Sequence, residues 1–408
     1  MSAVPGHRSE HPPHAPSNEA FPSRFRARRA RRVRESILQR HLRRRVARVL
    51  DGSGVTLDGP HPWDLQVRDP RFFARTLAFG SLGFGDAYVD GWWGARDVAG
   101  CIERLIRHRA DARTAAPTRR FLAARHRFAN VQLGAGSWRV GREHYDLGDD
   151  LFESMLGERL VYSCAYWAGA DDLDSAQLAK LDLVCRKLEL APGMRVLDIG
   201  CGWGEALKYA SQQYGVSGVG VTVSRQQADA ARRLCAGLPI EIRLADYRTL
   251  DERFDRVFSV GMFEHVGPRN YATFFEVVAR CLDSDGLALL HTIGTQTGRR
   301  TPDPWIERHI FPNSAIPRLD DVVIALGRHF AVEDLHNFGF DYVRTLEAWR
   351  ERFDAAWPRL EPRYGPRFRR AWHYYLAASI ASFRARRNHV WQFVLAPHRR
   401  RPVYRSPR

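Results

Sequence analysis

The sequence has little of several features that would place it in a special class. In 408 residues no apolar run approaches the ~20 residues that a transmembrane helix needs. No apolar segment follows the basic residues near the N-terminus, so we expect no signal peptide. The six cysteines, at positions 101, 164, 185, 201, 235 and 281, form no Cys-x-x-Cys pair. This scatter argues against a disulfide framework or a zinc cluster and favours reducing cytoplasm, so we expect a globular protein of two or three domains.

The net charge of +17 is concentrated in the two tails of the chain. Residues 1–50 hold thirteen Arg against three Glu, and residues 397–408 add five Arg and no acid. The body between the tails is therefore nearly neutral. A basic tail on a neutral body indicates an anionic partner, and either a phospholipid surface or a nucleic acid would serve.

The N-terminal arm divides into two parts. Residues 1–23 are rich in Pro, His and Ser without apolar periodicity, so we expect disorder there. From Ser23 to Leu50 apolar residues recur every three to five positions, with Arg in most other places. This pattern predicts a basic amphipathic helix, which either lies on an anionic membrane or packs on its own domain with a solvated Arg face.

Residues 51–135 have the composition of a small, mainly helical unit. Val55-Thr-Leu-Asp-Gly predicts a strand and a turn, and a helix is expected with Asp69 as its N-cap and Pro70 at its first position. The stretch 134–137, Gly-Ala-Gly-Ser, is typical of a linker. We therefore expect an arm over 1–47, a small membrane- or lipid-associated domain over 48–135, and a catalytic domain over 136–408.

The stretch 195–204 is the centre of the predicted catalytic domain. A short apolar strand, Val196–Ile199, ends at three glycines, Gly200, Gly202 and Gly204, and helix-prone sequence follows. Glycine permits a tight turn and the close approach of a ligand. The spacing is not that of the dinucleotide fingerprint. With Asp198 two residues before the first glycine, it is similar to the S-adenosylmethionine loop of class I methyltransferases; the other interpretation is a glycine-rich turn without a ligand.

Strands and helices alternate around this loop. Strand-like runs are 216–223, 240–244, 256–260 and 287–293, and helical segments include 176–190, 225–235 and 271–281. In the first of these helices the apolar face comprises Leu178, Leu181, Val184, Cys185 and Leu188. Aromatic-rich helices over 344–388 and a closing strand over 389–395 follow. This alternation predicts an α/β fold with a doubly wound parallel sheet.

Chemically capable side chains follow two of the predicted strands. Glu264 and His265 come after one strand, and His291 ends another. Ligands of such sheets bind beyond the carboxyl ends of the strands. Upstream, Tyr162 and its aromatic neighbours could face a sulfonium through cation–π attraction.

Seven motifs in order resemble one family. They are Gly80-Ser-Leu-Gly-Phe-Gly-Asp-Ala-Tyr-Val-Asp-Gly-Trp-Trp, His144-Tyr-Asp-Leu-Gly-Asp-Asp-Leu-Phe, Tyr162-Ser-Cys-Ala-Tyr-Trp, Val196-Leu-Asp-Ile-Gly-Cys-Gly-Trp-Gly, Gly261-Met-Phe-Glu-His-Val-Gly, Leu290-His-Thr-Ile-Gly and His336-Asn-Phe-Gly-Phe-Asp-Tyr. The chain resembles, over about residues 48–395, the cyclopropane-fatty-acyl-phospholipid synthases and their relatives the mycolic acid cyclopropane synthases. The small N-terminal unit points to the phospholipid enzymes, because the mycolic acid relatives generally lack it.

The resemblance implies transfer of a methylene unit from S-adenosylmethionine to a cis double bond of a phospholipid acyl chain. It also implies which residues surround the cofactor. Besides Asp198 and the glycine loop, these are Tyr162, Ser163, Gly200, Gly202, Thr222, Gln227, Tyr247 and Arg248. It also implies a bound bicarbonate as base, held by Cys164, Glu264, His291, Tyr342 and the backbone carbonyl of Ile293. Attack of the alkene on the sulfonium methyl leaves a carbocation, so a base must remove a proton from the added methyl and water must be excluded.

Each of these residues also has an ordinary interpretation. Cys164 could be a small core residue or a nucleophile, and His291 a core histidine. Glu264 could pair with an Arg, and His265 is expected only to support it. Some family members carry a cysteine, proposed as catalytic, where this chain has Ser379, so no essential thiol is expected there.

Two other functions compete with cyclopropanation. A lipid methyltransferase could quench the same carbocation by hydride shift and reduction, giving a methyl-branched chain. A nucleic-acid-binding protein would use the Arg-rich arm, but that arm lacks interleaved aromatics for base stacking, so no nucleic acid is expected. We expect a cytoplasmic protein held peripherally at the inner face of the membrane, and the sequence leaves a homodimer open.

Overall fold

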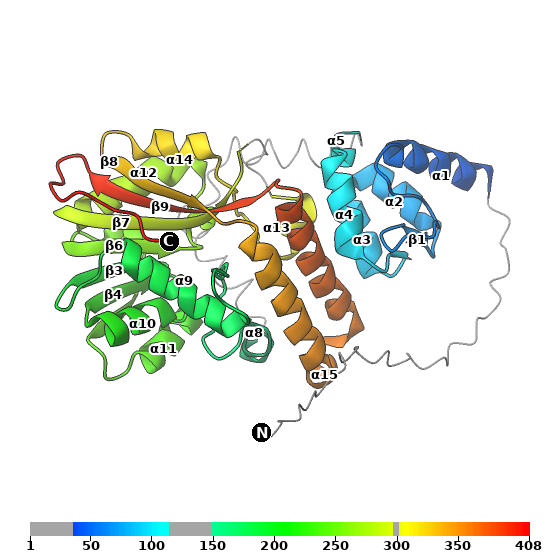
Figure 1. Cartoon of the computed structure of the whole chain (residues 1–408). Helices are drawn as coiled ribbons and strands as arrows, with labels where there is room; N and C mark the ends of the chain where they lie inside the picture. Colours follow the sequence, from blue (N-terminus) through cyan, green and yellow to red (C-terminus); the bar gives the residue numbers. More distant parts are fainter. Residues whose placement is uncertain (1–35, 114–147, 297–301) are drawn as a thin grey trace, which may run out of the picture.

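The computed structural model describes residues 36–113, 148–296 and 302–408. A small helical unit lies beside a larger α/β body, and a long bent helix connects the two (Figure 1). The expected disorder over 1–23, the first part of the arm helix and the linker at 134–137 lie outside the described residues.

The α/β body is built on a seven-stranded sheet of order β5-β4-β3-β6-β7-β9-β8. Its strands are β3 (Arg195–Ile199), β4 (Ser217–Thr222), β5 (Ile240–Leu244), β6 (Phe254–Val260), β7 (Leu282–Gly294), β8 (Phe330–Asn337) and β9 (His389–Pro397). The five strands from β3 to β7 run parallel, as predicted.

The sheet departs from the predicted parallel arrangement at one edge. β9 runs antiparallel between β7 and β8. The edge strand β8 was not predicted at all, because six of its eight residues are partly or fully exposed and the stretch lacks a continuous apolar run. Strand β9, in contrast, was predicted as a closing strand, and its seven central residues are all buried.

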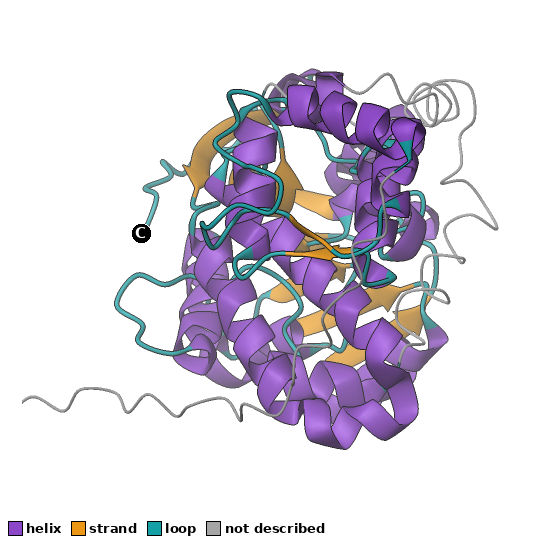
Figure 2. Ribbon diagram, turned by 90° about the vertical axis from the view of Figure 1, so that its right-hand side faces the viewer, coloured by secondary structure: helices purple, strands orange, loops and turns teal. Residues whose placement is uncertain are grey.

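Helices cover both faces of the sheet (Figure 2). On one face pack α9 (Leu173–Lys187), α10 (Glu205–Tyr214) and α11 (Arg225–Leu234), and on the other α12 (Tyr271–Cys281) and α14 (Leu319–Leu326). Because βα units place helices on both faces, the strands are buried and their carboxyl ends share one edge of the sheet. The candidate site lies at that edge.

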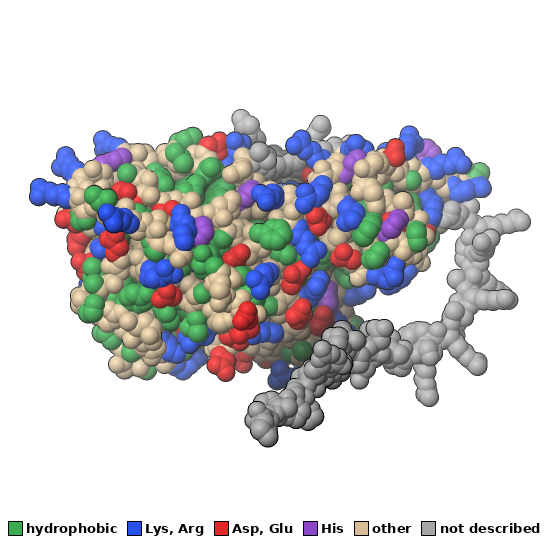
Figure 3. All heavy atoms as spheres, viewed as in Figure 1, with side chains coloured by type: hydrophobic (Ala, Val, Ile, Leu, Met, Phe, Trp, Pro, Cys, Tyr) green, Lys and Arg blue, Asp and Glu red, His purple; other side chains and the backbone are tan. Residues whose placement is uncertain are grey.

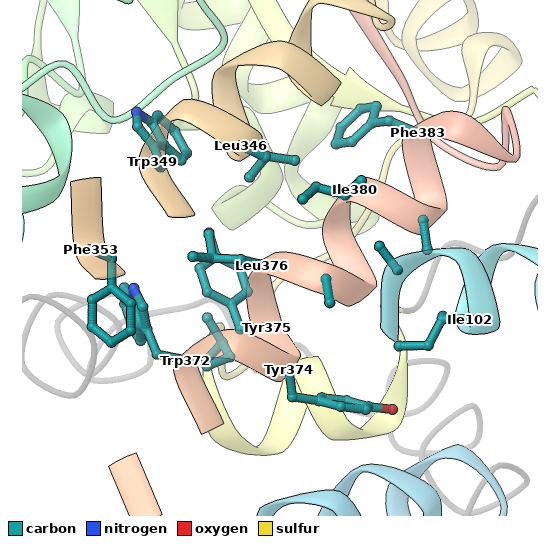
Figure 4. Close-up of a cluster of buried hydrophobic side chains, with 14 of the residues drawn as sticks. Ile102, Leu346, Trp349, Phe353, Trp372, Tyr374, Tyr375, Leu376, Ile380 and Phe383 are labelled. Carbon is teal, nitrogen blue, oxygen red and sulfur yellow. The ribbon is translucent and has the colours of Figure 1, made fainter. Parts of the chain in front are cut away.

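The helix α15 (Asp341–Arg384) forms the bridge between the two bodies. Its axis bends at Gly365, whose φ of 71° and ψ of 165° are not helical. The two arms enclose aromatic side chains that include Trp349, Trp372 and Tyr375, with Ile102 of α4 (Val98–Arg107) beside them (Figure 4). The predicted helices over 344–388 are thus confirmed. None of the described helices combines the length and hydropathy needed to span a membrane.

The small unit contains, besides α4, the helices α1 (Ile37–Leu50), α2 (Arg71–Phe79), α3 (Ser81–Val89) and α5 (Ala110–Arg113) and the two-stranded sheet of β1 (Gln66–Val67) and β2 (Trp93–Gly94). The expected boundary between residues 47 and 48 falls inside α1, whose Val46 and Leu50 are buried in the shared core. The expected strand at Val55 is only an isolated bridge between Leu57 and Leu65. Helix α2 begins one residue later than expected, with Pro70 as its N-cap.

Candidate active site

The turn after β3 opens a cavity at the carboxyl edge of the sheet. Gly200 and Gly202 have φ angles of +89° and +54°, which favour glycine. A Cβ on Gly200 would strike Met262 at 2.6 Å, whereas nothing lies within 4 Å of the position that a Cβ on Gly202 would take. Gly202 therefore faces open space within the cavity, where a ligand can approach the backbone.

Gly204 has a packing role that the sequence did not predict. It is the N-cap of α10 with φ of +90°, and a Cβ there would lie 3.1 Å from both Ala231 Cβ and Cys235 Sγ of the neighbouring helix segment. Gly204 does not line the cavity. It permits α10 and α11 to pack closely, and the expected ligand contact at Gly204 stays a prediction.

The cavity has a volume of about 200 Å³ and lies among the loops that follow β3, β4, β5 and β6. Of the expected cofactor residues, all but Gly204 line it: Tyr162, Ser163, Asp198, Gly200, Gly202, Thr222, Gln227, Tyr247 and Arg248. Thr222 Oγ1 donates to Gln227 Oε1 at 3.0 Å. Arg248 pairs with Asp246, which also lines the cavity. We name this space the cofactor cavity.

A buried lysine of the cofactor cavity was missed from the sequence. Lys180 of α9 is 1% exposed, and its Nζ donates to Ser163 Oγ at 3.0 Å. The buried carboxyl of Asp198 lies in the same cavity, and its Oδ1 has no hydrogen-bond partner. The available signal was a lysine at helical spacing from the apolar residues Leu173, Ala176, Leu183 and Val184 of α9, all of which are buried.

A second cavity, of about 270 Å³, adjoins the first. All five expected base-site residues line it: Cys164, Glu264, His291, Ile293 and Tyr342. Four residues line both cavities: Tyr162, Ser163, Gly261 and His265. A group bound in the cofactor cavity is therefore separated from the second cavity only by this shared rim.

Glu264 is held at the rim in the short helix η2 (Phe263–His265) that follows β6. Its Oε1 accepts from the backbone N–H of Ile293 at 2.7 Å, while its buried Oε2 has no partner. Among the described residues it forms no ion pair with an Arg, so that interpretation is wrong. Burial raises the pKa of Glu264 to about 7, which keeps a large share of the carboxyl protonated near neutral pH.

The neighbouring groups are neutral as well. His291 Nδ1 lies 3.3 Å from Gln392 Nε2; with this orientation of the amide, Nδ1 accepts and the ring carries its proton on Nε2. Burial holds the pKa of His291 well below its usual value and lowers that of His265 to about 4. Burial also raises the pKa of the Cys164 thiol well above its usual value. A thiol in this state is a poor nucleophile.

Apolar side chains from both bodies form the rest of the second cavity, which we name the acyl cavity. The small unit contributes Val46, Leu50, Leu65, Phe72, Phe84, Ile102 and Ile106; α15 contributes Leu346, Tyr374, Tyr375, Ala378 and Phe383, together with the hydroxyl group of Ser379. Tyr342 packs its ring against Phe383, with centroids 4.8 Å apart. The described lining suits a long apolar chain because most of its surface is apolar, although Asp111, Asp303 and Arg387 also line it.

The strand order, the glycine loop and the cavity at the switch point define the fold of the S-adenosylmethionine-dependent methyltransferases. Among solved structures, the cyclopropane synthase MmaA2 of Mycobacterium tuberculosis matches with a TM-score of 0.59 and 32% identity, covering 64% of this chain and 98% of that one. The mycolic acid cyclopropane synthase CmaA1, solved with S-adenosylhomocysteine and CTAB, matches with a TM-score of 0.58 and 32% identity over 63% and 97% of the two chains.

The family model described as mycolic acid cyclopropane synthetase matches residues 135–393, and the chain belongs to this family. The cyclopropane-fatty-acyl-phospholipid synthase of Escherichia coli K12 is 48% identical over 357 residues, which cover 85% of this chain and 91% of that protein. The predicted family is thereby confirmed, and the similarity to the E. coli enzyme includes much of the small unit.

Proposed function

We propose that this protein transfers a methylene unit from S-adenosylmethionine to a cis double bond of a phospholipid acyl chain and closes a cyclopropane ring. The observation that carries this function is the rim that the cofactor cavity and the acyl cavity share, at Tyr162, Ser163, Gly261 and His265. A sulfonium methyl at that rim would face an alkene in the acyl cavity. The similarity to a cyclopropane-fatty-acyl-phospholipid synthase supports the same substrate class.

Exclusion of water is the first task of the protein in this reaction. The alkene is a weak nucleophile, and its attack on the methyl leaves a carbocation that water would quench. Tyr162 packs against Trp349 and Phe152, with ring centroids 5.2 and 5.4 Å apart. Such faces attract a cation without forming a bond to it. The aromatic wall therefore suits both the sulfonium and the carbocation that replaces it.

The base site fits a small oxyanion. Glu264 Oε2 is buried without a partner, and the neutral His291 presents Nε2–H as a donor. We propose that Glu264, His291, Cys164, Tyr342 and the carbonyl of Ile293 hold bicarbonate. When bound, bicarbonate would supply the base for ring closure. A protonated Glu264 can share its proton with such an anion, whereas an ionised one would repel it; the raised pKa of Glu264 supports the first state.

We also propose peripheral binding to the cytoplasmic face of an anionic membrane. On α1, Arg40, Arg44, Arg45 and Arg48 are exposed, and Ile37 and Leu38 are 80% and 65% exposed. Arg side chains are visible on the surface around this helix (Figure 3). Basic residues beside exposed apolar ones are the composition of helices that lie at a membrane surface. The same helix lines the acyl cavity through Val46 and Leu50, so docking would bring the lipid to the site.

Product analysis tests the proposed function. The purified protein is incubated with S-adenosylmethionine and vesicles of phospholipid with monounsaturated chains, and the lipids are analysed by mass spectrometry. Cyclopropanation adds CH2 to a chain, whereas a reduced methyl branch adds CH4, so the two lipid-modifying functions give different masses. Removing dissolved carbon dioxide should lower turnover, and adding bicarbonate should restore it. A chain of unchanged mass under all conditions would contradict the proposal.

A further inference from the structure

Lysine is scarce in this chain and two of the few lysines are buried. Of 63 basic residues only three are lysines, at positions 180, 187 and 208. Lys180 and Lys187 lie two turns apart on α9 and are 1% and 0% exposed. Because a buried ammonium costs several kcal/mol unless it is paired, each one requires an explanation.

Lys187 has a structural explanation. Its Nζ lies 2.9 Å from Asp334 Oδ2, and Arg408 pairs with the other oxygen of the same carboxylate at 2.6 Å. Neither Lys187 nor Asp334 lines the cofactor cavity. Lys187 therefore belongs to an ion-pair network that ties α9 to β8.

Lys180 lacks such a partner. It forms no ion pair with a carboxylate of the described residues, and Ser163 Oγ accepts its one hydrogen bond, at 3.0 Å. In the same cavity Asp198 is 2% exposed, and its Oδ1 accepts no hydrogen bond. A buried cation and a buried acid thus both line the cofactor cavity with unused bonding capacity.

We propose that Lys180 is a positioning residue for the amino-acid end of S-adenosylmethionine: it orients the Ser163 hydroxyl toward the α-carboxylate of the ligand, while Asp198 accepts from the α-ammonium. The inference rests on the proposed function, since it names the groups that recognise one end of the same methyl donor. It adds a residue, Lys180, that acts through Ser163.

The hydroxyl of Ser163 has its direction set by Lys180. An ammonium can only donate, so Ser163 Oγ must accept from it. The hydroxyl then keeps its own proton to donate elsewhere, and Ser163 lines the cofactor cavity. The Ser163 hydroxyl, oriented in this way, requires an acceptor on the ligand. The α-carboxylate is the strongest acceptor at the amino-acid end of the ligand.

The charges of the cavity agree with a zwitterion. Burial lowers the pKa of Lys180 to about 8 and raises that of Asp198 to about 8; each group favours the charged form of the other, but burial outweighs this attraction. A ligand that brings a carboxylate and an ammonium supplies the missing partner to each group. A ligand whose end carries no charge would leave the free-energy cost of burying these two groups unchanged.

The test compares two ligands on matched variants. S-adenosylhomocysteine carries the amino-acid end, and methylthioadenosine keeps the adenosine and the sulfur but lacks that end. We expect Lys180→Met to weaken S-adenosylhomocysteine tenfold or more in calorimetry and to leave methylthioadenosine within twofold of wild type. Lys187→Met is the control, because it removes an equally buried lysine from the same helix; it should lower the melting temperature and change neither affinity.

Ser163→Ala provides a second variant that removes a single oxygen atom from the chain. It should cause the same selective loss for S-adenosylhomocysteine, and adding Lys180→Met to it should cost little more, since the two residues act as one unit. Equal weakening of both ligands by Lys180→Met, or full additivity in the double variant, would overturn the inference. Failure of the wild-type protein to bind S-adenosylhomocysteine would instead contradict the proposed function.

Discussion

The carboxyl of Glu264 accepts a hydrogen bond from the backbone N–H of Ile293 at 2.7 Å. This bond joins the segment after β6 to the end of β7, the adjacent strand. It fixes one carboxyl oxygen and leaves the other, Oε2, buried without a partner at the base site. The backbone of the sheet thus orients a carboxyl group toward the acyl cavity.

The first prediction concerns the role of this carboxyl in turnover. Glu264→Gln keeps an acceptor for the Ile293 N–H and removes the acidic proton. We expect kcat to fall roughly 10²–10⁴-fold, the usual value of general acid–base assistance. Affinity for S-adenosylhomocysteine should stay unchanged, because Glu264 lines the acyl cavity and not the cofactor cavity. Full activity in the folded variant would remove Glu264 from the mechanism.

The second prediction concerns stability of the same variant. Burial raises the pKa of Glu264 from 4.5 to about 7, so the native state holds this proton more tightly than the unfolded state. The contribution of Glu264 to wild-type stability should therefore be lost as pH rises from about 4.5 through 7. Glu264→Gln cannot ionise and should escape the penalty, which reaches about 3 kcal/mol at most.

Denaturant unfolding at two pH values checks this expectation. At pH 8 Glu264→Gln should be more stable than wild type, and near pH 4.5 the difference should vanish. A purely structural Glu264 gives the opposite result, because the variant would then be destabilised at both pH values. Asp198 also has a raised pKa, but it is present in both proteins and cancels in the comparison.

Sequence reasoning located the parts of the site that follow strands. Glu264 and His291 could be predicted to converge because the carboxyl ends of neighbouring parallel strands meet at one edge. The glycine loop was recognisable from its spacing. The motif containing Tyr342 was assigned only by resemblance, since that residue reaches the site from α15, far along the chain.

Other features depended on tertiary contacts that no local pattern reveals. Lys180 was left off the apolar face of its helix, which included Leu178 instead; in the structure Lys180 is buried and Leu178 is only partly so. The ammonium is held by Ser163, seventeen residues earlier. Gly204 was assigned to the cofactor by its spacing alone, yet it packs against α11.

The third prediction concerns the basic surface of α1. Arg44 and Arg48 are exposed, and the glutamine variants of both remove two charges from this surface. We expect Arg44→Gln/Arg48→Gln to weaken binding to anionic vesicles at low salt by roughly 2 kcal/mol, or more than tenfold, because each basic group near such a surface contributes roughly 1 kcal/mol. Salt should reduce the difference.

A variant with equal charge loss elsewhere is the control for α1. Arg233→Gln/Arg328→Gln removes two exposed charges from the α/β body and should bind vesicles almost as wild type does. Equal losses in the two double variants would show that net charge alone matters and would contradict docking through α1. Binding to DNA at matched salt separates the membrane from a nucleic acid as partner.

The last prediction concerns the glycine loop. Gly202→Val places a branched side chain where nothing lies within 4 Å of the Cβ position and where the cofactor cavity opens. The side chain should enter the cofactor cavity and exclude the ligand, so calorimetry should detect no binding of S-adenosylhomocysteine. The φ of +54° adds backbone strain, and this should lower the melting temperature modestly.

The effect of strain must be separated from that of occlusion. Gly237 has a φ of +81° and also has nothing within 4 Å of its Cβ position, but it is exposed and lies outside both cavities. Gly237→Val should therefore lower the melting temperature by a similar amount and bind S-adenosylhomocysteine with wild-type affinity. If Gly202→Val is folded and binds the ligand unchanged, Gly202 does not contact the methyl donor. If both variants lose binding together, the loss at Gly202 reflects instability, because only one of the two side chains enters the cofactor cavity.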